Sequence, residues 1–337
     1  MEGDAAVIGT GLIGASVGLA LRAAGWNVFG WDADPDALTA AARRGAVEEA
    51  ASEEQAIRSA ELVFLCGPLK AILEQLPRVP VGKLATDVAG VKAPVVKSAG
   101  STRFVGGHPM AGRETSGPDR STPTMFRGAS WILTTDGADG ADLDKVGEVV
   151  ASFGAIPLLM SAADHDEAVA AVSHLPQVVA SAMVGQVDGA VARQLAAGGF
   201  RDITRVAASD TSWWPEILTG NSASVARHLR ALAADLDQWA GLIESGDQAA
   251  IRADLEAASA ARRSLAAPVA ALRVMLDDRP GEVARVGMAL AASRVDLRDL
   301  ELRHSTEGGA GVLTLSVRPE EESALRAALA AEGLAVI

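Results

Sequence analysis

Cysteine is nearly missing from this chain of 337 residues, which contains only Cys66. A single cysteine cannot form an internal disulfide and cannot build a cysteine-based zinc site, so we expect no disulfide framework and no metal site. Basic residues are also outnumbered, with 30 Lys and Arg against 43 Asp and Glu and a net charge of −13. This charge argues against a nucleic-acid partner or an anionic membrane surface. An anionic ligand would need positive charge placed locally in a pocket.

Targeting signals are missing as well. The N-terminus runs directly into the strand-like "AAVIGTG" without a basic segment or a cleavage site, so we expect no signal peptide. No uninterrupted apolar run reaches the length of a membrane span. Hydrophobic residues make up 49% of the chain and charged residues 22%, which is enough to bury sizeable cores. We therefore expect a cytoplasmic protein of two or three domains.

The first part of the chain alternates short apolar runs with helical patterns. Apolar residues recur at helical spacing over 11–24, 35–44 and 141–153. This alternation is typical of a parallel sheet covered by helices, so we predict a Rossmann-type doubly wound α/β domain over residues 1–162. The candidate strands are residues 5–9, 27–32, 62–66, 84–88, 103–107, 130–135 and 155–160.

The middle of the chain, residues 163–266, has a different character. Three long segments rich in Ala and Leu carry apolar residues at helical spacing, over 164–187, 222–244 and 247–264. They predict an all-α domain, since Ala has the highest helix propensity and allows helices to approach closely. A flat Ala-rich surface can serve as a dimer interface, so a homodimer is favoured over a monomeric helical bundle.

The last part, residues 267–337, returns to mixed structure. Strand patterns occupy 269–276, 295–303 and 311–317, and the final "LAVI" is a fourth candidate strand. Helical patterns lie between them, at residues 281–292 and 320–332. The order β-α-β-β-α-β predicts a ferredoxin-like α+β domain.

The segment "VIGTGLIG" places Gly9, Gly11 and Gly14 at a strand-to-helix junction in the spacing of a dinucleotide-binding loop. The first glycine permits a tight turn, the second lets the backbone approach a pyrophosphate, and the third lets the helix pack on the strand. Ligands of such sheets lie where the carboxyl ends of the strands converge. We expect the same crevice to be lined by Thr10, Leu12, Ile13, Cys66, Gly67, Pro68 and Asp87.

An acidic residue follows the second strand. Asp32 lies eighteen residues after Gly14, where a carboxylate accepts hydrogen bonds from the adenosine ribose hydroxyls. Such a group favours NAD and repels the additional phosphate of NADP. The alternative is that Asp32 only caps the next helix, for which Asp34 is the better candidate.

His108 is one of only five histidines and follows the candidate strand 103–107. Hydride transfer needs a base for the substrate hydroxyl, and imidazole titrates near neutrality. A lone histidine is more often a satisfied structural residue. The position just beyond a strand end, where open α/β sheets hold ligands, favours a catalytic role here.

Three longer motifs accompany this histidine: "HPMAGRETSG" (108–117), "SHLPQ" (173–177) and "FRDITRVAASDTSWW" (200–214). Together they resemble the prephenate dehydrogenase family, and the resemblance extends over essentially the whole chain. It implies a dinucleotide-binding domain, a helical dimerisation domain and a C-terminal ACT-like regulatory domain. It also implies oxidative decarboxylation of prephenate with NAD, to 4-hydroxyphenylpyruvate and CO2, in tyrosine biosynthesis.

The resemblance assigns roles to individual residues. His108 would take the proton of the ring hydroxyl, and Arg205 would hold a substrate carboxylate as a bidentate fork. Other readings stay open: Arg205 as a surface charge, Trp214 as a core residue, Glu114 as a helix cap and His174 as the start of a buried helix. The substrate-binding residues that the resemblance implies are Arg205, Glu114, Ser116, Asp202, His174, Trp214 and Gly90.

The chain departs from the family pattern at two positions. Gly90 in "TDVAGVK" stands where many members have a serine that contacts the catalytic histidine, so a water or the backbone amide would replace it. Gln177 stands where many members have a second histidine. Both departures put the details of substrate preference in doubt.

Alternatives remain for substrate and regulation. The same fold could act on arogenate or on an amino-substituted prephenate, or the chain could be a non-catalytic NAD-binding sensor of an amino acid. In the C-terminal domain, Gly281 lies in the loop "LDDRPGEVARV" (276–286), where ACT domains bind amino acids, with tyrosine the expected effector. Equally, this domain could only aid dimerisation.

Overall fold

The computed structural model describes residues 3–111, 117–189, 194–265, 270–277, 279–303 and 311–337. The chain packs as two compact units, Met1–Asp235 and Leu236–Ile337, and each is described by itself. The predicted domain boundaries at 162/163 and 266/267 stay predictions, since this division by packing falls within one long helix.

A parallel sheet of six strands forms the centre of the first unit, in the order β3-β2-β1-β4-β5-β6. The order reverses between β1 and β4, which creates a crevice at the carboxyl ends of these strands. Residues of β1 alternate between two cores: Ala5 and Val7 pack on one face, and Ala6 and Ile8 on the other. The strands are β1 (Asp4–Ile8), β2 (Asn27–Trp31), β3 (Glu48–Glu49), β4 (Leu62–Leu65), β5 (Leu84–Asp87) and β6 (Arg103–Val105).

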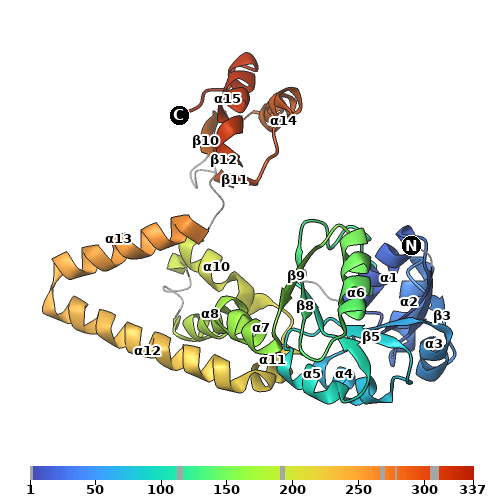
Figure 1. Cartoon of the computed structure of the whole chain (residues 1–337). Coiled ribbons are helices and arrows are strands. Elements are labelled where there is room, and N and C mark those ends of the chain that lie inside the picture. Colours follow the sequence, from blue (N-terminus) through green and yellow to red (C-terminus); the bar gives the residue numbers. More distant parts are fainter. Residues whose placement is uncertain (1–2, 112–116, 190–193, 266–269, 278, 304–310) are drawn as a thin grey trace. The chain divides into compact units, whose positions relative to one another are not determined.

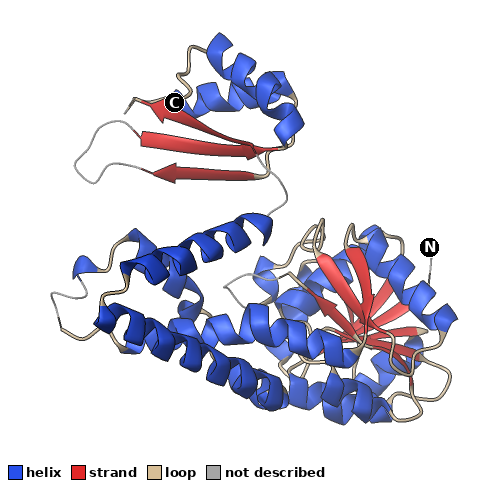
Figure 2. Ribbon diagram, turned by 60° about the vertical axis from the view of Figure 1, so that its left-hand side comes forward, coloured by secondary structure: helices blue, strands red, loops and turns tan. Residues whose placement is uncertain are grey.

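Helices cover this sheet, as Figure 2 shows around the strands of the first unit. Their starts carry ordinary capping chemistry: Asp34 accepts from the amide of Asp36 at one helix, and Ser52 from the amide of Gln55 at the next. The predicted Rossmann-type fold is confirmed. The helices are α1 (Leu12–Ala23), α2 (Pro35–Arg43), α3 (Glu53–Ser59), α4 (Leu69–Gln75) and α5 (Ala93–Ala99).

A second sheet follows, and here the predicted strand 103–107 is corrected. It divides at Gly106 into β6, which stays in the parallel sheet, and β7 (Gly107–Pro109), which pairs antiparallel with β8 (Ser130–Thr134). A Cβ atom on Gly106 would lie 2.5 Å from Thr134 Oγ1, so only glycine fits this change of direction. Strand β9 (Ile156–Met160) pairs parallel with β8 after helix α6 (Gly140–Ser152).

One continuous helix, Ala162–Gly185, comprises α7 (Ala162–Val169), a π-helical turn (Ala170–His174) and α8 (Leu175–Gly185). Pro176 has no amide proton to donate back along the helix, which accounts for the wider turn just before it. By length and composition alone, this is the one helix in the described part of the chain that could cross a membrane. Its buried side chains His165, Asp166 and His174 are hydrogen-bonded within the first unit.

Shorter elements complete the first unit: α10 (Gly198–Thr204), a 3-10 turn (Arg205–Ala208), α11 (Trp214–Gly220) and the start of α12 (Ser222–Ser245). The 3-10 turn packs against α8. Helix α12 continues into the second unit, where α13 (Gln248–Leu265) follows it after a turn at Gly246 (Figure 1).

The second unit also contains a small antiparallel sheet in the order β10-β12-β11. Alternate residues of β10 face its core, and Val336 forms a single bridge with Val274 on the outer edge of that strand. The expected β-α-β-β-α-β order is therefore present, with "LAVI" reduced to one bridge. The elements are β10 (Ala270–Leu276), α14 (Glu282–Ser293), β11 (Asp299–Arg303), β12 (Gly311–Val317) and α15 (Glu322–Ala331).

The glycine loop yields a stability test. A Cβ atom on Gly14 would lie 1.9 Å from the carbonyl oxygen of Gly9, so Gly14→Ala has to push α1 away from β1. We expect a loss of about 3 kcal/mol in the free energy of unfolding, measured by urea denaturation. Gly11→Ala is the matched control, because a Cβ there has no described atom within 4 Å. It should lose at most about 1 kcal/mol, and equal losses in the two variants would contradict this packing.

Candidate active site

The loop between β1 and α1 has the geometry of a phosphate-binding turn. Gly9 adopts a φ of +94°, which is in the left-handed region that favours glycine. Its amide donates to the carbonyl of Trp31 (2.8 Å), which ties the loop to β2. A side chain on Gly11 would enter open space at the start of α1, where backbone amides point outward. The residues present therefore fit the pyrophosphate of a dinucleotide.

Asp32 lies at the end of β2 and faces this loop. Its Oδ2 atom accepts from the amide of Thr10 (2.5 Å) and from the Thr10 hydroxyl (3.1 Å). Helix α2 is capped by Asp34 instead, which accepts from the amide of Asp36 at 3.0 Å. The Asp32 carboxylate is half-buried beside the glycine loop, and its Oδ1 atom also accepts from the amide of Asp34 at 2.9 Å. Asp34, and not Asp32, is the N-cap of α2, while the contact of Asp32 with a ribose stays a prediction.

Cys66 and Gly67 follow β4 on the other side of the crevice. The amide nitrogen of Gly67 is 2.6 Å from the position of a Cβ on Gly9, so the two turns are in contact. Burial, with a smaller contribution from Asp87, raises the pKa of the Cys66 thiol. Cys66 is half-buried, and its place in the lining of the cofactor crevice stays a prediction. Pro68, two residues further on, is the N-cap of helix α4.

His108 projects from β7 and belongs to a chain of hydrogen bonds. Its Nδ1 atom is 2.8 Å from Nε2 of His165, and the two rings meet edge to face. The Nδ1 atom of His165 is in turn 2.8 Å from Oδ1 of Asp166. The carboxylate of Asp166 also accepts from the backbone amides of Lys92 (2.6 Å) and Ala93 (2.8 Å).

A buried ion pair supports the backbone of this histidine. Lys92 and Asp87 are both fully buried and paired, and the Lys92 ammonium also donates to the carbonyl of Gly107 (2.6 Å). Asp87 accepts from the amides of Ala89 and Gly107, both at 2.9 Å. The carboxylate of Asp87 is thus occupied inside the protein. These bonds support the turn that carries His108, and the expected place of Asp87 in the cofactor crevice stays a prediction.

The surroundings of His108 disfavour the charged form of its imidazole. Burial is the main reason that its pKa lies well below 6.5, and the neighbouring His165, Lys92 and His174 lower this pKa further. A Cβ atom on Gly90 would lie 3.8 Å from Nε2 of His108 and 3.3 Å from Ile217 Cδ1. Gly90 therefore faces the imidazole, at the position where a serine was expected from related sequences.

With this geometry, comparison with known proteins is informative. The profile of the prephenate dehydrogenase nucleotide-binding domain matches residues 17–158, and that of the prephenate dehydrogenase dimerization domain matches residues 161–257. The chain belongs to the prephenate dehydrogenase family. The expected family and fold are confirmed.

Individual relatives support this family assignment. Prephenate dehydrogenase of Bacillus subtilis is 28% identical over 96% of this chain and 94% of its own length. The arogenate dehydrogenase structure from Synechocystis is 30% identical, with a TM-score of 0.69, over 78% of this chain and all of that one. The A. aeolicus prephenate dehydrogenase structure, in complex with hydroxyphenyl propionate and NAD+, is 28% identical with a TM-score of 0.74, over 78% of this chain and 98% of that one.

Two further residues that the family resemblance singles out connect to the histidine chain. His174 and Trp214 meet edge to face, with ring centroids 6.1 Å apart. The side-chain amide of Asn221 lies 3.4 Å from Nδ1 of His174 and donates to the backbone carbonyl of Asp166 (2.6 Å). His174 is buried and shares the Ala162–Gly185 helix with His165.

Two of the remaining residues predicted to bind substrate are exposed. Arg205 starts the 3-10 turn and is exposed, and Asp202 is exposed on α10. Glu114 and Ser116 lie outside the described residues. The convergence of Arg205 and His108 on one substrate therefore stays a prediction.

Sequence reasoning missed His165, Asp166, Lys92 and Asn221. The first two stand in "DHDEA" (164–168), within a helix whose apolar spacing resembles a plain core helix. Lys92 is the last residue of the "TDVAGVK" segment, in which only Gly90 departs from the family pattern described above. A buried position for a charged residue cannot be read from such segments without knowing which other segment packs on them.

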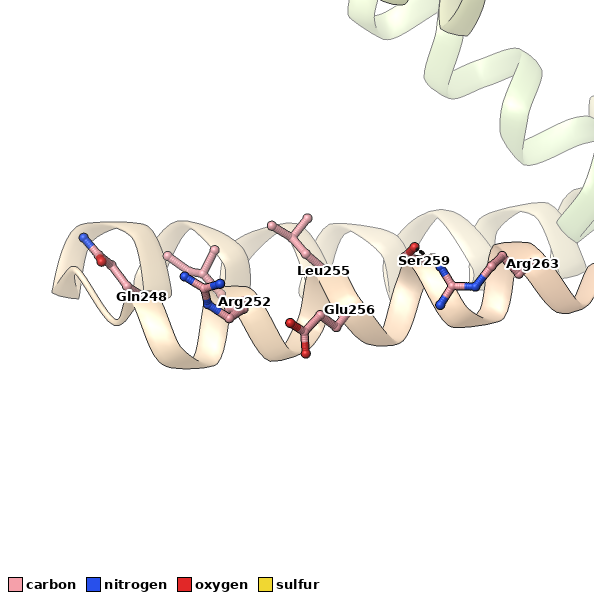
Figure 3. Close-up of a pocket in the computed structure, with 7 residues that line it drawn as sticks. Gln248, Arg252, Leu255, Glu256, Ser259 and Arg263 are labelled. Carbon is pink, nitrogen blue, oxygen red and sulfur yellow. Dashed lines mark hydrogen bonds between the residues drawn. The ribbon is translucent and has the colours of Figure 1, made fainter. Parts of the chain in front are cut away.

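A hollow elsewhere in the chain does not belong to this site. About 520 Å³ in volume, it is lined only by residues of α13, among them Arg252, Glu256 and Arg263. Figure 3 shows these side chains projecting from one helix. None of the histidine chain lines it.

Stability should decrease in mild acid because the buried His174 and the half-buried His108 resist protonation. Burial lowers the pKa of His174 to about 4, from 6.5, and that of His108 also lies well below 6.5. Above pH 6.5 both residues are neutral whether the chain is folded or not. As the pH falls below 6.5, only the unfolded chain binds these protons, so the free energy of unfolding decreases.

Urea unfolding between about pH 7 and pH 5 measures this loss, of which His174 should contribute about 2 kcal/mol. The variant His174→Gln removes that titrating group and should flatten the pH dependence. An equal slope in the variant would show that His174 does not cause it.

Proposed function

We propose that this protein catalyses the NAD-dependent oxidative decarboxylation of prephenate to 4-hydroxyphenylpyruvate and CO2, in tyrosine biosynthesis. The observation that carries the proposal is the neutral, half-buried imidazole of His108 at the carboxyl edge of a dinucleotide-binding sheet. Bound NAD supplies the hydride acceptor. Relatives named prephenate dehydrogenase, one of them with NAD+ bound, support the same activity.

His108 acts as the general base. Its Nε2 atom takes the proton of the ring hydroxyl while the hydrogen on the same carbon leaves as hydride. The ring carboxylate then departs as CO2, and the electrons of the broken bond complete the aromatic ring. The phenolic oxygen recovers the proton from His108, so no net proton is consumed at this residue.

Arg205 is proposed to bind a substrate carboxylate as a bidentate fork. Trp214 and His174 form an aromatic wall beside the histidine chain, and Asp202, Glu114 and Ser116 are proposed to line the polar end of the pocket. With Gly90 at the position of the usual serine, a water or the amide of residue 90 is the proposed partner of the hydroxyl.

Arogenate is the second candidate substrate. The similarity to the Synechocystis arogenate dehydrogenase, at 30% identity, favours keeping it. A single assay separates the two: purified protein with NAD and either prephenate or arogenate, followed by NADH absorbance. Turnover of neither substrate would overturn the proposed function and favour a non-catalytic NAD-binding sensor.

The dimerisation domain suggests a homodimer. Several large apolar side chains of the helical region are exposed in the isolated chain, among them Val172, Ile203 and Leu255.

In the second unit, Gly281 has a φ of +99° at the start of α14. We propose tyrosine as an effector at this loop of an ACT-like domain, and a thermal shift with tyrosine but not with phenylalanine or tryptophan would support it.

His108→Asn tests the base. We expect kcat to fall by about 10²- to 10⁴-fold, the usual contribution of a positioned general base, while NADH still binds. NADH fluorescence titration provides the binding control. Near-normal turnover would remove His108 from the mechanism.

Arg205→Ala tests the substrate anchor. Loss of the guanidinium should raise KM for prephenate by at least about 30-fold, because leaving a bound carboxylate without its partner costs about 2–5 kcal/mol. Arg201→Ala is the matched control, since Arg201 is also exposed and lies one turn earlier on α10. If both variants show the same KM, Arg205 does not bind the substrate.

A further inference from the structure

We propose that His165 and Asp166 are positioning residues that fix the tautomer of His108, so that its Nε2 atom carries the lone pair that accepts the substrate proton. This inference rests on the proposed function, because it assigns how the same site prepares its base. It starts from the hydrogen-bond chain Asp166–His165–His108, in which each link measures 2.8 Å.

Asp166 determines which atoms donate and which accept in this chain of hydrogen bonds. Its carboxylate accepts two backbone amides, from Lys92 and Ala93, which hold both oxygens in place. A carboxylate is an acceptor only, so the Nδ1 atom of His165 must carry a hydrogen and donate it to Asp166.

This assignment of the hydrogen on His165 in turn determines which nitrogen of His108 carries a hydrogen. With its one ring hydrogen on Nδ1, His165 has a lone pair on Nε2, which can only accept. The hydrogen between the two rings therefore belongs to Nδ1 of His108. Its Nε2 atom is left without hydrogen and faces the space beside Gly90.

The same chain stabilises the product of proton transfer. When Nε2 of His108 takes a proton, the imidazolium is still bonded through Nδ1 to the lone pair of His165, which the Asp166 carboxylate makes a stronger acceptor. No other bond changes. The groups around His108 are Lys92 and Asp87 near β5 and β7, and His165, Asp166 and His174 on the Ala162–Gly185 helix.

The two residues are held rigidly. His165 and Asp166 are buried, and the backbone carbonyl of Asp166 accepts from Asn221 at 2.6 Å. If the two residues were purely structural, Asp166 would only hold two helices together and His165 would only fill the core. That reading predicts loss of stability without any effect on which nitrogen of His108 is protonated.

The variant Asp166→Asn separates these readings. If its new amide group faces His165, it donates to Nδ1 of that ring. His165 then carries its hydrogen on Nε2 and His108 is forced into the opposite tautomer. We expect kcat to fall at least about 100-fold, with KM and NADH affinity within about threefold of wild type. Glu167→Gln is the matched control: the next residue on α7 is a half-exposed carboxylate paired with Arg227, and its loss should leave kcat unchanged.

Nitrogen-15 NMR of labelled histidine gives a readout that does not need activity. In wild type we expect His108, assigned by its loss in His108→Asn, to be protonated at Nδ1 and not at Nε2. A hydrogen on Nε2 of His108 in wild type would overturn the inference, and so would a kcat of Asp166→Asn within threefold of wild type when NMR shows that the variant carries the hydrogen on Nε2 of His108. If wild type turns over neither substrate while the NMR result is as expected, the proposed function fails and the tautomer assignment stands.

Discussion

The buried ion pair between Lys92 and Asp87 is the interaction on which the candidate site depends. Both side chains are completely shielded from solvent, and breaking such a pair typically costs about 3–5 kcal/mol because one charge is left buried alone. The pair also holds both ends of Gly107, whose carbonyl accepts from Lys92 and whose amide donates to Asp87. His108 is the next residue. The pair therefore fixes the backbone from which the imidazole reaches His165.

Local patterns are sufficient to predict most of the fold. Most of the parallel strands are apolar runs, and β1, β4, β5 and β6 are followed by glycine-containing turns. The order of elements then predicts a Rossmann-type sheet. The second sheet is different. Residues 103–107 have the pattern of one strand, and nothing in that pattern tells that Gly106 is where the chain changes sheets, because the reason is the close approach of Thr134. Strand β3 has two residues, too few for any period to be visible.

In the candidate site, too, some residues could be predicted from the sequence and others could not. The glycine loop and Asp32 are close in sequence to the strands that carry them, so their roles follow from spacing. His108 could be predicted from its place after a strand and from the family motifs. Its partners could not: His165 is 57 positions away and Asp166 bonds to Lys92 across 74 positions. These contacts exist only because α7 packs on the start of α5, which is a property of the tertiary structure.

Burial has two opposing effects on a histidine base, and the surroundings of His108 address both. Removing the ring from water disfavours its charged form, so the imidazole is neutral at neutral pH and one of its nitrogens is free to accept a proton. The same desolvation weakens the base at the moment when it must take a proton. A fixed acceptor on the far side of the ring offsets this, since it stabilises the charged form only after the proton has arrived. Asp166 can do so through His165 without placing a negative charge next to the carboxylates of the substrate, which a direct contact between Asp166 and His108 would do.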